Sequence, residues 1–238
     1  MPITVIPYIP RTITVHTGPA GQWAEDVTVS VPDYINNVAS SEIYPTWSEA
    51  ALRANILAQV SFALNRVYTE YYRSRGYSFD ITGSTQNDQK FIKGRSTFEN
   101  VDRLVDELFN TYIRHKGTVE PLSARFCNGT TTTCDGLSQW GSENLAKQGY
   151  NYIDILRHYY GDDIELVSNA PIRDIAESYP GSPLRRGSYG QYVTVLQVML
   201  NRVGRSYPAI PRIDPENGFF NRQTESAVKA FQRVFNLA

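Results

Sequence analysis

Glu42 is a candidate for acid–base chemistry because of the residues around it. It lies in the stretch 39–47, whose apolar side chains can form a wall around the carboxyl, namely Ile43, Tyr44, Pro45 and Trp47. Such a wall disfavours the charged form and raises the pKa of the carboxyl. A carboxylic acid that is still protonated near neutral pH can donate a proton to a glycosidic oxygen. The simpler interpretation is a solvated charge, or a partner for the dipole of the helix that follows.

Ser138, Gln139 and Trp140 form a second candidate site, much further along the chain. The amide of Gln139 can bond the N-acetyl or hydroxyl groups of a sugar, and the ring of Trp140 can stack on one. The structural alternative is a loop ahead of a helix, with Ser138 as its cap and Trp140 in the core. On the residues alone, both interpretations stay open.

The elements that position these residues are expected to form an α+β fold, with a long helix against a small sheet. Alternating apolar residues over 12–16 and 27–31, with a glycine turn between them, predict two strands. A short helix is expected over 34–38, after the break at Pro32 and Asp33.

The longest helix is expected to begin at Thr46, because Thr46 and Glu49 fit a capping box. Apolar residues recur along it at steps of three or four and predict one buried stripe, and the helix should stop near Gly76. The remaining pattern predicts strands over 77–81 and 119–126, and helices over 100–115, 141–148 and 152–160.

Prolines and glycines interrupt the pattern from Ser168 to Gly187, which indicates a domain boundary. We therefore expect a first domain over 1–170, a linker over 171–183 and a small helical module over 184–238.

The bulk properties of the chain exclude several classes. The net charge of the 238 residues is −1, so nothing favours nucleic acid or an anionic membrane as a partner. No stretch approaches the ~20 apolar residues that span a bilayer, and the N-terminus lacks the basic region of a signal peptide. Cys127 and Cys134 are compatible with free thiols and with a local disulfide.

Residues 39–47 and 136–141 together resemble the stage II sporulation protein D family, or SpoIID/LytB-like domain, which acts on bacterial cell wall. The resemblance implies that Glu42 is the catalytic residue of a lytic transglycosylase. It also places the later segment in the catalytic groove, so we expect six residues to bind substrate: Ser41, Tyr44, Trp47, Ser138, Gln139 and Trp140. The implied reaction cleaves the bond between N-acetylmuramic acid and N-acetylglucosamine without water, and one carboxylate serves as acid and then as base. A hydrolase usually needs two carboxylates, and Asp33, Glu49 and Asp135 stay open as a second one.

The sequence also departs from the family pattern. The usual histidine before the second motif is missing from residues 132–134, and Val60 replaces an arginine of the long helix. Some relatives bind zinc near this turn through one histidine and two cysteines. Zinc needs three or four ligands, and no histidine lies close to Cys127 and Cys134, so we expect neither a metal nor another cofactor.

Residues 193–197 and 224–232 resemble the peptidoglycan-binding type 1 domain, which implies a three-helix module that binds peptidoglycan. The whole arrangement looks most like the spore cortex-lytic enzymes of clostridia, which implies an extracytoplasmic place in cell wall or spore cortex. The competing hypotheses are a non-catalytic protein that binds peptidoglycan and enhances an amidase, and a phage or bacteriocin-type lysin with the same chemistry.

Overall fold

The computed structural model of the chain describes residues 7–175 and 180–237. Its contacts divide the chain into two compact units, of which the first is Pro7–Ile175. Each unit has a hydrophobic core of its own. The predicted limits 1–170, 171–183 and 184–238 remain predictions, and strand β9 (Ile172–Arg173) lies inside the segment expected to be a linker.

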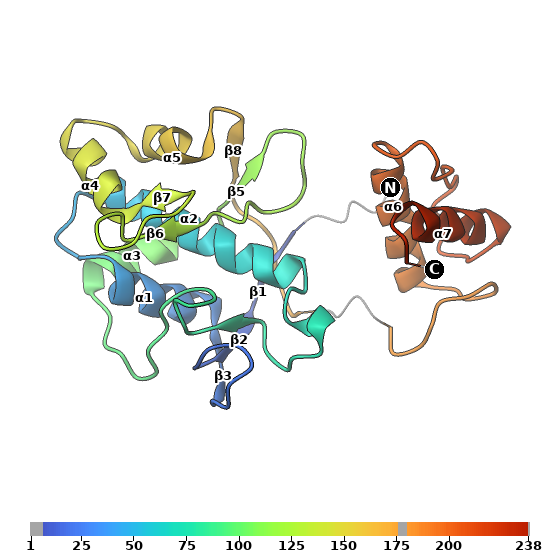
Figure 1. Cartoon of the computed structure of the whole chain (residues 1–238), viewed down its shortest axis with the longest axis horizontal. Coiled ribbons are helices and arrows are strands. Elements are labelled where there is room, and N and C mark those ends of the chain that lie inside the picture. The colour runs from blue at the N-terminus through green and yellow to red at the C-terminus, as the bar shows by residue number, and fades with distance from the viewer. Residues whose placement is uncertain (1–6, 176–179, 238) are drawn as a thin grey trace. The chain divides into compact units, whose positions relative to one another are not determined.

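Helix α2 (Glu49–Tyr68) runs through the middle of the first unit, with other elements on several sides (Figure 1). Its residues from Ala51 to Asn65 are nearly all buried, whereas the sequence pattern predicted a single buried stripe. A helix that is covered all round needs apolar or small residues on every face, and the alanines and leucines of α2 supply them. The remaining helices of this unit are α1 (Val31–Glu42), α3 (Glu99–Leu108), α4 (Gln139–Lys147) and α5 (Tyr152–Tyr160).

The sheets of the first unit are small. A three-stranded sheet has the order β3-β2-β4, in which β2 is antiparallel to β3 and parallel to β4. The other strands form three pairs, of which β5–β8 is antiparallel and β1–β9 and β6–β7 are parallel. The bounds are β1 (Ile9–Pro10), β2 (Thr12–His16), β3 (Asp26–Ser30), β4 (Ile81–Thr82), β5 (Tyr112–His115), β6 (Phe126–Cys127), β7 (Leu137–Ser138) and β8 (Ile164–Val167). Helices and small sheets together confirm the predicted α+β class.

Two of the predicted helix starts were wrong. Helix α1 covers 31–42 instead of 34–38, because Pro32 lies in its first turn and the hydroxyl of Ser30 accepts a hydrogen bond from the backbone N–H of Asp33. Helix α2 begins at Glu49, and Thr46 is exposed outside it. Glu49 forms ion pairs with arginines instead of a capping box.

Helix ends and strands were also displaced. Helix α2 ends at Tyr68, and Gly76 instead ends the short 3₁₀ turn η1 (Arg73–Arg75). Helix α3 ends at Leu108, and the rest of the predicted helix over 100–115 contains strand β5, which pairs with β8 far along the chain. The predicted strands over 77–81 and 119–126 shrink to β4 and β6.

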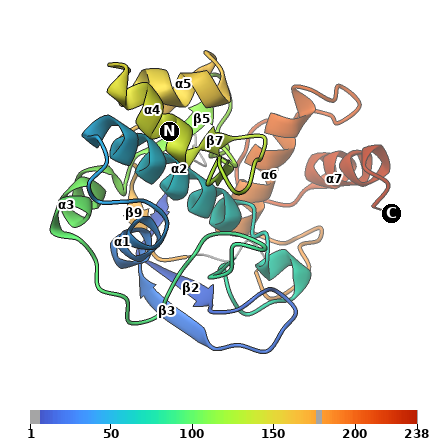
Figure 2. The same ribbon diagram turned by 60° about the vertical axis from the view of Figure 1, so that its left-hand side comes forward.

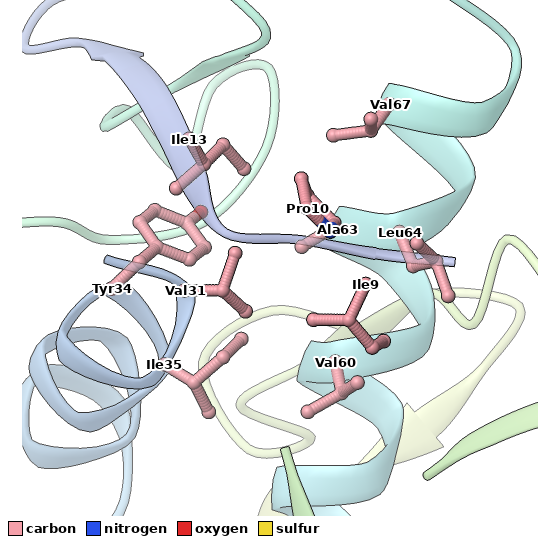
Figure 3. A pocket seen from close by; sticks show the side chains of 10 residues that line it. All are labelled: Ile9, Pro10, Ile13, Val31, Tyr34, Ile35, Val60, Ala63, Leu64 and Val67. Atoms are coloured by element: carbon pink, nitrogen blue, oxygen red, sulfur yellow. The ribbon is translucent and has the colours of Figure 1, made fainter. Parts of the chain in front are cut away.

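Helices α4 and α5 both pack on α2, and the two views agree on this layer (Figure 2). On the other side of α2, apolar side chains of α2 itself and of β1, β2 and α1 line a cavity of about 10 Å³ (Figure 3). That volume is at the lower limit for one water molecule, so this part of the core is filled. Among the described residues, no helix combines the length and the apolar character needed to cross a membrane.

The second unit is a small helical module. Its described residues contain two α-helices, α6 (Gln191–Gly204) and α7 (Arg222–Val234), where three were expected. Buried Gln197 of α6 ties the module together, because its amide donates to the hydroxyl of Thr224 and accepts from the backbone N–H of Gly218.

Candidate functional site

Glu42 is the last residue of α1, and this position changes its electrostatics. The sequence left open that Glu42 pairs with the dipole of the following helix. It instead lies at the C-terminal end of its own helix, where the free carbonyl groups carry partial negative charge. That end of a helix disfavours an anion, so the position itself favours the protonated carboxyl.

The carboxyl of Glu42 is held by two neutral donors. The side-chain Nε2 of Gln59 donates to Oε2 at 3.1 Å, and the backbone N–H of Lys90 donates to Oε1 at 2.8 Å. Glu42 is partly buried. Desolvation of its carboxyl raises the pKa to about 7, although both hydrogen bonds and the charge of Lys90 favour the ionised form. The side chain therefore changes its protonation near neutral pH, as an acid that later acts as a base requires.

The apolar residues after Glu42 lie partly in the core and partly at the surface. Ile43 is 4% exposed and Trp47 9% exposed, whereas Tyr44 is 55% exposed. The ring of Tyr44 contacts that of Trp47, with 5.6 Å between centroids.

An aromatic cluster brings the two candidate motifs together. The rings of Tyr44 and Trp140 are 5.6 Å apart, and those of Trp47 and Trp140 are 5.0 Å apart. We call Tyr44, Trp47 and Trp140 the aromatic cluster. It begins two residues after Glu42 and combines an exposed ring with two more deeply placed ones, as a surface that stacks on sugar rings would require.

The other predicted site residues have structural contacts. Ser138 caps α4, since its hydroxyl accepts from the backbone N–H of Gly141 at 3.0 Å. Gln139 is 5% exposed, so most of its side chain is covered. The hydroxyl of Ser41 is buried, without a hydrogen-bond partner in the described part of the chain.

A further carboxylate near the cluster, that of Glu143, was not among the predicted site residues. Glu143 of α4 is 3% exposed, and its Oε2 accepts from the backbone N–H of Ser48 at 2.8 Å. Its Oε1 lies 3.2 Å from the ammonium of Lys147. Glu143 therefore caps the start of α2 from a neighbouring helix and holds α4 against it. No signal in the sequence indicated this contact, because Thr46 and Glu49 offered a local capping box and Glu143 lies 95 residues from Ser48.

The loop between β6 and β7 is closed by a disulfide between Cys127 and Cys134, which settles the choice left open between thiols and a bridge. The carbonyl of Asn128 in this loop accepts from the backbone N–H of Trp140. Gly129 has a φ of +85°, and a Cβ added there would lie 1.8 Å from the hydroxyl oxygen of Ser138. The backbone of the disulfide loop is thus packed directly against the segment 138–140.

The three other acids proposed as partners have different roles. Asp33 accepts from the hydroxyl of Ser30 at the opposite end of α1 from Glu42. Glu49 forms ion pairs with Arg53 and Arg103, and Asp135 is exposed in the disulfide loop. Within the described ranges, no group of three or more histidine, cysteine and acidic residues is arranged to hold a metal ion.

Comparison with known families bears on both units. The family model of the stage II sporulation protein matches residues 20–113, and the model of a peptidoglycan binding domain matches residues 189–238. Both resemblances are confirmed. The first match includes Glu42 and all of α2 but ends before the segment 138–140. A search of curated proteins finds no match to the chain.

These matches support a peptidoglycan-associated role related to the cell wall and sporulation. The stage II sporulation protein family is associated with peptidoglycan degradation, which supports an enzyme role. The C-terminal match supports peptidoglycan binding, and together the matches point to an extracytoplasmic or cell-wall role.

Proposed function

We propose that the first unit is a peptidoglycan lytic transglycosylase and that Glu42 is its proton shuttle. The observation that supports this most directly is the carboxyl of Glu42, whose pKa burial raises to about 7, two residues from an aromatic cluster with an exposed ring. One carboxyl that titrates in this range can give a proton and take one back within a single turnover.

The reaction needs no second carboxylate. Protonated Glu42 donates its proton to the glycosidic oxygen between N-acetylmuramic acid and N-acetylglucosamine, and that C–O bond breaks. Ionised Glu42 then removes the proton from the C6 hydroxyl of the muramoyl residue, whose oxygen attacks C1. The products are a 1,6-anhydromuramoyl end and a free N-acetylglucosamine hydroxyl, and the enzyme regains its proton.

The aromatic cluster is the proposed glycan platform. Exposed Tyr44 offers a ring face to a sugar, and Trp47 and Trp140 support it from behind. In this proposal Ser41, Ser138 and Gln139 border the groove, with Ser138 also holding α4. The second unit keeps the enzyme on the wall or spore cortex.

The test is mass analysis of soluble muropeptides released from defined cortex and from vegetative peptidoglycan. Wild-type protein should release 1,6-anhydromuramoyl products, and Glu42→Gln should release none, because its amide cannot shuttle a proton. Glu49→Gln is a matched control, since it removes an exposed carboxylate just after the same motif. Anhydromuramoyl products from Glu42→Gln at wild-type yield would exclude the mechanism. Wild-type protein that binds peptidoglycan and releases nothing would favour the amidase-enhancing alternative.

A further inference from the structure

Gln59 is a fully buried amide in the middle of α2, with 0% exposure. Its Nε2 donates to Oε2 of Glu42, and its own Oε1 has no hydrogen-bond partner among the described residues. A buried amide oxygen that accepts no hydrogen bond costs free energy, and this cost is removed in any protonation state that places a donor hydrogen beside it. The group beside it that gains a donor hydrogen is the carboxyl of Glu42, when that carboxyl is protonated.

The second donor to Glu42 depends on the same network. The amide of Gln89, also 0% exposed, donates to the backbone carbonyl of Gln59 at 3.1 Å and accepts from the hydroxyl of Tyr34 at 2.8 Å. These two bonds fix the position of Gln89 between α1 and α2. The next residue, Lys90, then directs its backbone N–H at Oε1 of Glu42. Both carboxyl oxygens are thus held by groups that are anchored to α2 at Gln59.

We propose that Gln59 is a positioning residue that holds Glu42 in both of its protonation states. When Glu42 is ionised, Nε2 of Gln59 donates to Oε2, as the structure shows. When Glu42 is protonated, the amide turns about its last bond and Oε1 accepts the hydrogen from Oε2. A glycosidic oxygen in the groove then competes with Gln59 for that proton. The catalytic consequence rests on the proposed function, whereas the exchange of hydrogen bonds does not.

The test is a direct titration of the Glu42 carboxyl by carbon-13 NMR, assigned by the signal that Glu42→Gln lacks. Gln59→Met keeps the length of the side chain and removes both polar atoms. The ionised form of Glu42 loses a charge-assisted hydrogen bond, whereas the protonated form loses only a weaker neutral one, so the midpoint should rise from its wild-type value by about one pH unit.

Asn55→Leu is the matched control, because Asn55 is a second buried amide one turn earlier on α2, bonded to Ser142 and not to Glu42. It should lower the melting temperature and leave the Glu42 midpoint at the wild-type value. A Gln59→Met protein whose Glu42 titrates as in wild type overturns the inference.

Gln59→Glu replaces the first variant if Gln59→Met does not fold, since it retains size and polarity. Two carboxyls in contact cannot both ionise easily, so the pair should titrate in two separated steps, one of them above the wild-type midpoint. A single unchanged midpoint counts against the inference. These titrations use no substrate. If wild-type protein released no anhydromuramoyl product, the proposed function would be wrong, and the titrations would still test the role of Gln59.

Discussion

Helices α1 and α4 each carry a glutamate near the aromatic cluster, Glu42 and Glu143, but the surroundings of the two carboxyl groups differ. Glu143 faces the ammonium of Lys147 and the vacant N–H at the start of α2, so its charge is compensated and joins two helices. Glu42 lies at the carbonyl end of its helix and accepts hydrogen bonds from two neutral donors, and the ammonium of Lys90 acts on it only through its charge, without a hydrogen bond. The difference indicates that the fold uses Glu143 as a structural anion and leaves Glu42 free to change protonation.

The largest effect expected from this comparison is a gain in stability when the charge of Glu42 is removed. The pKa of Glu42 is 4.5 in the unfolded chain and about 7 in the folded protein, so between these values the folded protein binds more protons than the unfolded chain. The free energy of unfolding therefore falls as the pH rises from 4.5 through about 7. The difference between 4.5 and 7 corresponds to about 3 kcal/mol. Glu42→Gln should therefore be more stable than wild type by up to about 3 kcal/mol above pH 7, measured by urea unfolding. Equal stabilities of the two proteins at pH 8 would show that folding does not raise the pKa of Glu42.

The disulfide loop packs against the start of α4, so removal of the disulfide should lower the stability of the first unit. Replacing both cysteines, Cys127→Ser with Cys134→Ser, should lower the free energy of unfolding by about 2.5 kcal/mol, because a short closed loop is lost from the unfolded state. Wild-type protein in reductant should approach the same value, and the variant should not respond to reductant. An identical melting temperature with and without reductant would contradict this.

Removing the structural anion should have the opposite signature to that of Glu42→Gln. Glu143→Ala leaves the N–H of Ser48 without its acceptor and should lower the free energy of unfolding by about 2 kcal/mol. Anhydromuramoyl products should persist, because Glu42 keeps its carboxyl. Lys147→Ala is the control and should change stability by less than about 1 kcal/mol, since the ammonium is mostly exposed. Loss of products from a stable Glu143→Ala protein would assign Glu143 to the chemistry.

Ser138→Ala should give the smallest effect, a loss of about 1 kcal/mol. The hydroxyl caps α4 through the backbone N–H of Gly141, and this bond is lost in the variant. Thermal melting measures the change, and Ser138→Thr should recover most of it. A much larger fall in product release than in stability would indicate that the hydroxyl also contacts glycan.

Local signals predicted much of the fold. The predicted bounds of α5 agree with the structure, because Asn151 caps it and Gly161 follows it. The α+β class followed from the alternation of strand and helix patterns. Helix α2 was misplaced at its start because its cap comes from Glu143, distant in sequence. Strand β5 was read as helix because its partner β8 lies far along the chain.

For the site, resemblance identified Glu42, but the residues that support it were not visible. Gln59 and Gln89 look like ordinary polar residues in the sequence, and only the packing of α1 against α2 brings them to one carboxyl. The position of Glu42 at the end of a helix was missed because the predicted helix stopped at Val38, four residues before α1 ends.

The exposed residues of the disulfide loop can be varied more freely than the residues that flank them. Glycines flank its exposed residues 130–135, and neither accepts a side chain, since a Cβ at Gly129 would meet Ser138 and one at Gly136 would meet the carbonyl of Arg125. A library for directed evolution should therefore keep both glycines and both cysteines and randomise the threonines between them. Because the carbonyl of Asn128 in the same loop accepts from the backbone N–H of Trp140, the randomised threonines belong to a loop that contacts the aromatic cluster.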